Sequence, residues 1–133
     1  MMAIALAAAL THAPVSRAEQ ENRFFHALAI VEGTNGDNDH GKAHGFFQIH
    51  YAYWRDAVKG RKELRVDDWR IWCWDWDYGK AIVTAYLARH APDAWQTGDW
   101  LKCAMVHHRG PTGAAKGRGR AYAQRVVALM NYE

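Results

Sequence analysis

The sequence has few cysteines, few prolines and no long hydrophobic run. Two cysteines and three prolines occur among its 133 residues, and no internal repeat, low-complexity block or linker is visible. So little cysteine excludes a fold held together by many disulfides, and a chain without a linker favours a single domain. Half of the residues are apolar and 13% are aromatic, which is enough for one buried core. We therefore expect one domain, covering residues 19–133.

The N-terminal segment is apolar only over a short length. Residues 4–10 form an apolar stretch that is too short to span a bilayer, so we expect no stable insertion into a membrane. Residues 16–18, Ser-Arg-Ala, fit the small-x-small pattern of a signal-peptide cleavage site, but no positive charge precedes Arg17. Residues 1–18 are therefore interpreted as a signal peptide or, alternatively, as a disordered N-terminal segment. The first interpretation predicts a secreted or periplasmic protein.

The charge of the chain is modestly positive. The formal net charge is +3 and the isoelectric point is about 9.0, which favours anionic partners such as cell wall, a membrane surface or nucleic acid. No recognisable nucleic-acid-binding motif accompanies the charge, so we expect no nucleic-acid partner. The basic residues near the C-terminus are Arg109, Lys116, Arg118, Arg120 and Arg125.

The two cysteines are Cys73 and Cys103. An even number in an exported protein predicts one disulfide between them, and the alternative is two buried free thiols. Zinc would need histidines at ligand spacing. Only His107 and His108 are adjacent, and neighbouring residues on a helix point about 100° apart. We therefore expect no metal site.

The apolar pattern predicts mostly helices. Residues 34–45 are rich in Gly, Asn and Asp, which predicts a loop or a small hairpin, and residues 46–49 predict a short strand or an extended turn. Residues 110–113 predict a further turn. The expected class is therefore α+β, mainly α, with a small β-hairpin region. The expected helices cover residues 19–32, 51–58, a segment starting at 69 after Asp67 or Asp68, residues 77–88 capped by Asp77, 100–107 capped by Asp99, and 120–130.

An acidic residue, Glu32, ends the first apolar helix. The negative end of the helix dipole and apolar neighbours both favour a protonated carboxyl, so we predict that the pKa of Glu32 is raised. Such an acid can protonate a leaving oxygen, as glycoside cleavage requires, while a second carboxylate meets the developing positive charge. Asp37 and Asp39, in the polar loop, are candidates for that second group. The alternative interpretation is a solvated helix end followed by ordinary turn-forming aspartates.

Four segments, in order, resemble the invertebrate-type lysozymes. Residues 27–33, ALAIVEG, look like the end of the catalytic helix, and residues 45–57 resemble the pattern Gly-x-Phe-Gln-Ile-x-x-x-Tyr-Trp-x-Asp-Ala. Residues 103–113, CAMVHHRGPTG, resemble a segment with His-Asn-Gly-Gly-Pro-x-Gly, and residues 120–126, RAYAQRV, are similar to a Tyr-x-x-x-Val ending. The first two segments are also similar to the soluble lytic transglycosylases. The matched order covers residues 24–130.

The resemblance implies a lysozyme-like fold with the hairpin beside the catalytic helix. It implies cleavage of the β-1,4 bond between N-acetylmuramic acid and N-acetylglucosamine in peptidoglycan, with Glu32 as the general acid and without a metal or organic cofactor. Asp39 is the first choice for the second carboxylate and Asp37 the second choice. The implied substrate-binding residues are Gln48, Tyr53, His107, Gly110, Pro111 and Tyr122, with Trp54 as a residue of packing or binding.

The chain departs from the family pattern at His108 and Arg109, where Asn and Gly are usual. Several alternatives stay open at this point. A lytic transglycosylase would use Glu32 alone and give 1,6-anhydro products, and the same residues could cleave chitin. A non-catalytic wall-binding module and a nucleic-acid binder are the alternatives from other classes. We expect a monomer whose partner is the peptidoglycan glycan strand.

Overall fold

The computed structural model describes residues 14–33 and 38–131, and within these ranges the chain is all-α. No strand occurs in the described residues, so the predicted α+β class is wrong, although its mainly helical character is confirmed. None of the helices found there is both long and apolar enough to cross a membrane. The helices are α1 (Arg17–Gly33), α2 (Asn38–Gly41), α3 (Tyr51–Val58), α4 (Trp69–Trp72), α5 (Trp76–His90), α6 (Pro92–Thr97), α7 (Trp100–Ala115) and α8 (Arg120–Met130).

The described part of the predicted hairpin is a left-handed turn followed by a tight loop. Residues 38–41, which form α2, all have positive φ, between 50° and 81°. His44 and Ile49 then form one isolated antiparallel bridge. The pairing stops there because Gly45 and Gln48 also have positive φ and turn the chain back on itself. The Gly/Asn/Asp composition thus produces left-handed turns in place of a hairpin.

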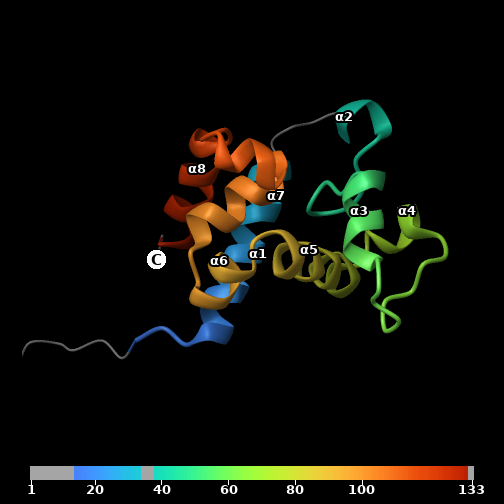
Figure 1. Ribbon diagram of the computed structural model, residues 1–133, viewed down its shortest axis with the longest axis horizontal. Coiled ribbons are helices and arrows are strands. Elements are labelled where there is room, and N and C mark those ends of the chain that lie inside the picture. Colours follow the sequence, from blue (N-terminus) through green and yellow to red (C-terminus); the bar gives the residue numbers. More distant parts are fainter. Residues whose placement is uncertain (1–13, 34–37, 132–133) are drawn as a thin grey trace, which may run out of the picture.

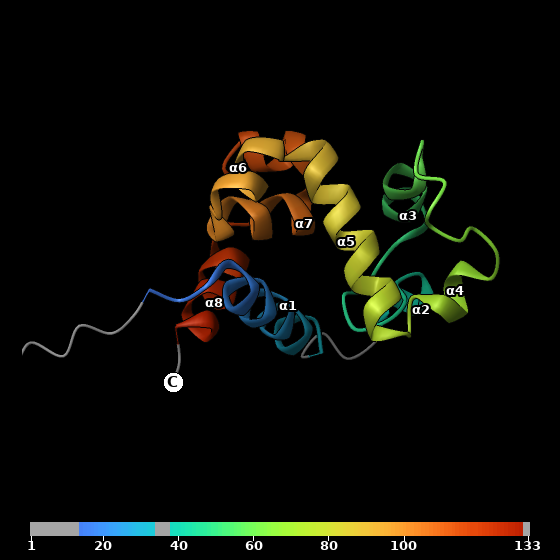
Figure 2. The same ribbon diagram turned by 90° about the horizontal axis from the view of Figure 1, so that it is seen from below.

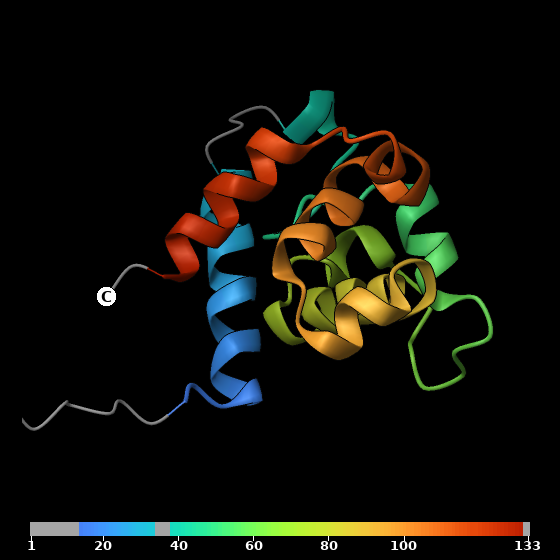
Figure 3. The ribbon, with the colours of Figure 1, turned by 60° about the vertical axis from the view of Figure 1, so that its left-hand side comes forward.

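The helices gather into two groups that α5 connects. Figures 1 and 2 show α1, α6, α7 and α8 on one side of the molecule and α2, α3 and α4 on the other, with α5 running between them. Helix α8 packs on α1 and α7, whereas α3 packs on α5. Figure 3 shows the first turns of α8 lying over the C-terminal end of α1. This crossing brings residues far apart in sequence to the end of α1, where Glu32 lies.

Aromatic side chains of α1 form the centre of the core. Phe24 and Phe25 are at most 1% exposed. The ring of Phe24 lies 4.9 Å from Trp100, and the ring of Phe25 lies 5.5 Å from Phe47 and 6.3 Å from Trp95. Aromatic pairs of this kind contribute about 0.5–1.5 kcal/mol beyond the burial of their area. Helix α1 is therefore held firmly, and so is the position of its last turn.

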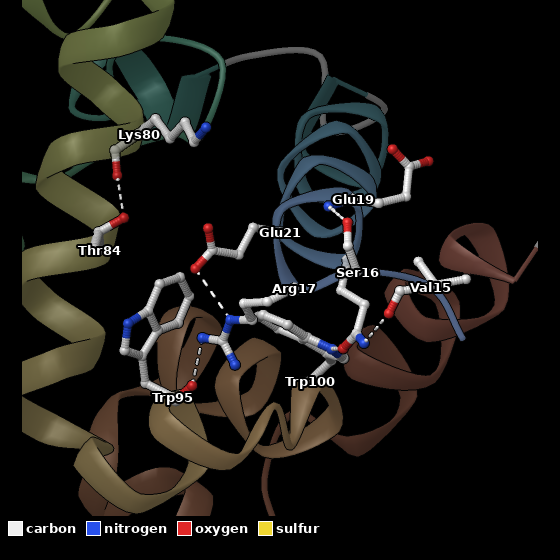
Figure 4. Close-up of polar contacts among 10 residues, drawn as sticks. Val15, Ser16, Arg17, Glu19, Glu21, Lys80, Thr84, Trp95 and Trp100 are labelled. Carbon is white, nitrogen blue, oxygen red and sulfur yellow. Dashed lines mark hydrogen bonds and ion pairs between the residues drawn. The ribbon is translucent and has the colours of Figure 1, made fainter. Parts of the chain in front are cut away.

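The start of α1 is fixed by Arg17 (Figure 4). Its guanidinium donates to Glu21 at 3.1 Å and to the backbone carbonyl of Trp95 at 2.5 Å, and it lies over the rings of Trp95 and Trp100. Cation–π contacts of this kind contribute about 0.5–2 kcal/mol. Helix α1 thus begins two residues before the domain start expected at residue 19, and that boundary stays a prediction.

Two helix starts test the expected capping residues. The Asp99 carboxylate accepts a hydrogen bond from the backbone N–H of Lys102 at 3.1 Å, which confirms the predicted cap of α7. The cap of α5 is Asp75, which accepts from the N–H of Tyr78 at 2.8 Å, whereas Asp77 lies inside the first turn. Gly110 interrupts α7 with φ 71° and ψ 172°, and the helix resumes after it. The turn expected at residues 110–113 is therefore only a kink.

The two cysteines do not form the predicted disulfide. Both are free and fully buried. Cys73 follows α4, with its backbone carbonyl against Gly45 and Gly79, whereas Cys103 lies in the first turns of α7, and Figure 2 shows these two helices on opposite sides of α5. Burial raises the pKa of each thiol to about 12. The predicted bridge is wrong because the fold places the two cysteines in different parts of the core.

Alkylation should therefore detect two thiols per chain. Denatured, unreduced protein is expected to take up two alkyl groups, and native protein is expected to react slowly because both thiols are buried and protonated. Mass spectrometry after alkylation measures the number of groups. Modification that occurs only after reduction would show a disulfide and contradict this arrangement.

Candidate functional site

A cleft of about 660 Å³ lies between the two groups of helices, and α5 contributes one of its residues. Glu32 is at the end of α1, and Tyr53 and Tyr86 come from α3 and α5. The cleft thus collects side chains from α1, α3, α5 and α7 and from the loop around α2. Its lining residues are Glu32, Asp39, Ala43, Gln48, His50, Tyr53, Tyr86, His107, His108, Arg109 and Gly110.

Glu32 is the buried acid of this cleft. It is 8% exposed and lies in the last turn of α1. Its Oε1 accepts a hydrogen bond from the Tyr122 hydroxyl of α8 at 2.5 Å, and it lies 3.6 Å from Nε2 of His107. Burial and the neighbouring carboxylate raise the pKa of Tyr122 far above its ordinary value, so Tyr122 keeps its proton and acts as the donor. The carboxyl is therefore held in one orientation at the edge of the cleft.

The hydrogen bonds of His107 determine which of its ring nitrogens carries a proton. Nε2 lies 3.1 Å from the backbone carbonyl of Phe47, which can only accept, so Nε2 carries a hydrogen. Nδ1 lies 2.8 Å from the Tyr53 hydroxyl. Burial raises the pKa of Tyr53 well above its ordinary value, so in the neutral ring Tyr53 donates to Nδ1. This arrangement turns an N–H of His107 toward Phe47 and Glu32.

The pKa of Glu32 is lowered, contrary to the prediction from the sequence. Burial alone raises it, but the polar and electrostatic interactions with His107, the hydrogen bond from Tyr122 and the electrostatic interaction with His108 lower it, and the net direction is below the ordinary value of 4.5. The helix end and apolar neighbours were the basis of the prediction. They are outweighed because Tyr122 of α8 donates a hydrogen bond to the carboxylate and His107 of α7 places an N–H 3.6 Å from it. Glu32 is thus a carboxylate at neutral pH in the free protein.

Asp39 lies in the same cleft and is much more exposed than Glu32. Its side chain is 59% exposed, and its carboxylate lies 3.3 Å from Nε2 of His50. The backbone is in the left-handed region, with φ 51° and ψ 56°, which a non-glycine residue adopts only at a cost in free energy. The structure therefore brings the first choice for the second carboxylate to the cleft. Asp37, the second choice, lies outside the described residues.

Gln48 connects the cleft to a second hollow. Its side-chain amide donates to Oδ1 of Asn38 at 3.0 Å and to the carbonyl of Gly45 at 2.9 Å. The second hollow, of about 200 Å³, shares Glu32 and Gln48 with the main cleft. It is also lined by Phe46 and Trp74, which are 44% and 49% exposed. Glu32 and Gln48 thus line two hollows.

The other predicted binding residues take different places. Gly110 lines the cleft, whereas Pro111 is exposed on α7 and is absent from the lining. Tyr122 is buried and bonds Glu32, so its hydroxyl is already occupied. Trp54 is a core residue, stacked on Trp69 at 5.5 Å.

Five residues of the cleft lining were not among the predicted site residues: Ala43, His50, Tyr86, His108 and Arg109. His50 directly follows the Phe-Gln-Ile segment, and this proximity is a signal that could have found it. Tyr86 stacks on Tyr53 at 3.7 Å, in a contact between α3 and α5 that the helical pattern alone does not specify. No cluster of three or more His, Cys, Asp or Glu side chains in the described residues has the arrangement of a metal site.

Comparison with protein-family models identified a match that covers most of the chain. A family model described as Destabilase matches residues 29–128, which is most of the chain and includes the lining residues of the cleft. This family comprises invertebrate-type lysozymes, with lysozyme and isopeptidase activity. No curated protein and no solved structure matches the chain.

Proposed function

Because the chain belongs to the Destabilase family of lysozyme-like hydrolases, we propose that it is a lysozyme that cleaves the glycan strands of peptidoglycan. The bond would be the β-1,4 linkage between N-acetylmuramic acid and N-acetylglucosamine. Glu32 would protonate the glycosidic oxygen, and Asp39 would stabilise or trap the positively charged sugar. Such a substrate lies outside the cytoplasmic membrane, so the proposal includes a secreted or periplasmic location.

The observation that supports this function most strongly is the place of Glu32 in two hollows. A general acid that cleaves a glycan needs one sugar on each side of the scissile bond. The main cleft of about 660 Å³ and the smaller hollow of about 200 Å³ both include Glu32 in their lining. A glycan that crosses Glu32 could therefore occupy both hollows. The exposed rings of Phe46 and Trp74 offer apolar surface to a sugar in the smaller hollow.

The nucleophiles of the chain favour the glycosidase over the isopeptidase activity. Ser16 is the only serine in the sequence, and its hydroxyl accepts a hydrogen bond from the backbone N–H of Glu19 at the start of α1. The two cysteines are buried and have pKa values raised to about 12. None of these groups lines the cleft. Nucleophilic attack on an isopeptide bond by serine or cysteine therefore has no support in this site.

Purified peptidoglycan tests the choice between these two activities. The wild-type protein is expected to release new reducing sugar ends and no new amino groups, because Glu32 is proposed to act on the glycosidic bond. Release of amino groups with intact glycan would support the isopeptidase instead. Anhydro sugar ends without new reducing ends would support a lytic transglycosylase, and binding to the wall without any of these products would support a non-catalytic wall-binding module.

The pH dependence should reflect the lowered pKa of Glu32. A general acid loses its proton as the pH rises through its pKa, and kcat/KM follows the free enzyme. We therefore expect kcat/KM to fall with rising pH, starting below pH 4.5, the ordinary pKa of glutamic acid. Tyr122→Phe removes a hydrogen bond that stabilises the carboxylate, so it should raise the pKa of Glu32 and move this fall to higher pH.

Tyr51→Phe is the matched control for this measurement. Tyr51 is 52% exposed and lies outside the lining of the cleft, so its substitution should leave the pH profile in place. A Tyr122→Phe profile that coincides with the wild type, or moves to lower pH, would contradict the role given to this hydrogen bond.

A further inference from the structure

We propose that Arg109 binds a carboxylate on the muramic acid residues of the glycan and thereby selects wall glycan over neutral chitin. This inference rests on the proposed function and identifies the chemical group of the substrate that the protein recognises. The carboxylate has two sources in peptidoglycan: the lactyl group of muramic acid itself and the acidic peptide attached to it. Both present the same chemistry to a guanidinium.

The position of Arg109 is the first observation. It lines the main cleft together with Glu32 and Asp39. It directly follows His108, whose ring stacks on Tyr122 at 4.0 Å with an angle of 3° between the planes, and Tyr122 in turn bonds Glu32. Arg109 is thus connected to the acid through two packed rings, and a group bound by its guanidinium would lie in the same cleft as the scissile bond.

The stem of Arg109 lies against two glycines. A Cβ atom added to Gly113 would lie 2.8 Å from Cβ of Arg109, and one added to Gly119 would lie 3.0 Å from its Cγ. Any larger residue at either position would displace the arginine stem. Close packing at Cβ and Cγ limits the conformations of the first part of the side chain before any ligand binds, which reduces the entropy lost on binding. The sequence thus provides room for an arginine at a position where the family pattern has glycine.

The guanidinium is available to a ligand. Among the described residues Arg109 forms no hydrogen bond or ion pair, and Arg109 is exposed to solvent. The acids of the cleft are engaged elsewhere, since Glu32 accepts from Tyr122 and Asp39 pairs with His50. Desolvation, followed by the positive charge of Arg109, lowers the pKa of His108. Arg109 therefore gives the cleft a fixed positive charge. This charge attracts a carboxylate, whereas neutral chitin has no negative charge to pair with it.

Binding measured with three ligands tests this assignment. The ligands are a neutral chitooligosaccharide, peptide-free wall glycan with lactyl carboxylates, and glycan fragments that carry the peptide. Titration by calorimetry on a Glu32→Gln background avoids turnover, and Arg109→Gln is then compared with the unchanged arginine. We expect Arg109→Gln to weaken binding of carboxylate-bearing glycan about 10-fold, the effect of one charge-assisted hydrogen bond, and to leave chitooligosaccharide binding unchanged.

Three further arms make the result specific. Arg120→Gln removes the same charge from an exposed residue outside the cleft and should change nothing. Arg109→Lys should retain part of the preference for carboxylate-bearing glycan over chitooligosaccharide. Added salt should reduce this preference in the variants with arginine or lysine at position 109 and not in Arg109→Gln. A loss seen already with peptide-free glycan identifies the lactyl carboxylate, and a loss confined to peptide-bearing fragments identifies the peptide.

Equal loss for neutral and acidic ligands, or no loss for either acidic ligand, would overturn the assignment. The proposed function fails separately, through wild-type protein that cleaves no glycan. The binding comparison needs no catalysis, so it decides the role of Arg109 in either case.

Discussion

Glu32→Gln is expected to lower the rate of wall cleavage about 10³-fold, which corresponds to roughly 4 kcal/mol of transition-state stabilisation. Glutamine has the same shape as glutamic acid but no acidic proton to give to the glycosidic oxygen. Its side-chain oxygen can still accept the hydrogen bond from Tyr122, so the fold should be retained. Turbidity clearing of purified cell walls measures the rate, and circular dichroism and thermal unfolding measure the fold.

Glu19→Gln provides the matched control for this substitution. Glu19 lies on the same helix α1, in an exposed position far from the cleft, and pairs with Arg23 at 3.2 Å. It should clear walls at the wild-type rate. A folded Glu32→Gln protein that clears walls nearly as fast as the wild type would remove Glu32 from the mechanism.

Asp39→Asn is expected to lower the rate at least about 100-fold, or about 2.7 kcal/mol. The carboxylate would meet the positive charge of the sugar in the transition state, as a nucleophile at about 5–5.5 Å from the carboxyl of Glu32 or as the base for a water at about 6.5–9.5 Å. Asp37→Asn should cost much less. Steady-state rates on soluble glycan fragments measure all of these variants.

His50→Gln distinguishes the effect of the Asp39 charge on the rate from the effect of the contact between Asp39 and His50. Asp39→Asn removes both the negative charge and the contact with His50, whereas His50→Gln removes only the partner. Asp93→Asn, on α6, is the matched control outside the cleft. A double Asp37→Asn, Asp39→Asn variant that keeps most of its activity would contradict a mechanism in which a second carboxylate acts together with Glu32. A mechanism with Glu32 alone would then apply, and the products would carry anhydro ends.

Local signals predicted the helices better than the segments between them. The bounds of α3 and α8 agree with the expected ranges 51–58 and 120–130, and Asp99 caps α7 as expected. These features depend on periodicity and on a cap within a few residues, which a single sequence shows directly. The prediction of a hairpin was wrong because a Gly/Asn/Asp-rich segment is compatible with left-handed turns as well as with the turn of a β-hairpin.

The polar network around Glu32 could not be predicted, because it depends on how distant helices pack. Tyr122 lies 90 residues after Glu32, and only the crossing of α8 over α1 brings its hydroxyl to the carboxylate. The sequence identified the residue and the helix end but assigned the wrong direction to its pKa. Cys73 and Cys103 illustrate the same limit, since an even number of cysteines does not specify where the fold places them.

Mass spectrometry of the products formed in ¹⁸O-labelled water tests the proposed glycan hydrolysis most directly. Hydrolysis at a carboxyl-catalysed site transfers an oxygen from water to the new sugar end. We therefore expect wild-type protein to release muropeptides with one ¹⁸O at a reducing N-acetylmuramic acid, and Glu32→Gln to release almost none. Unlabelled 1,6-anhydro ends, or intact glycan with ¹⁸O in a released peptide carboxylate, would contradict glycan hydrolysis in this cleft.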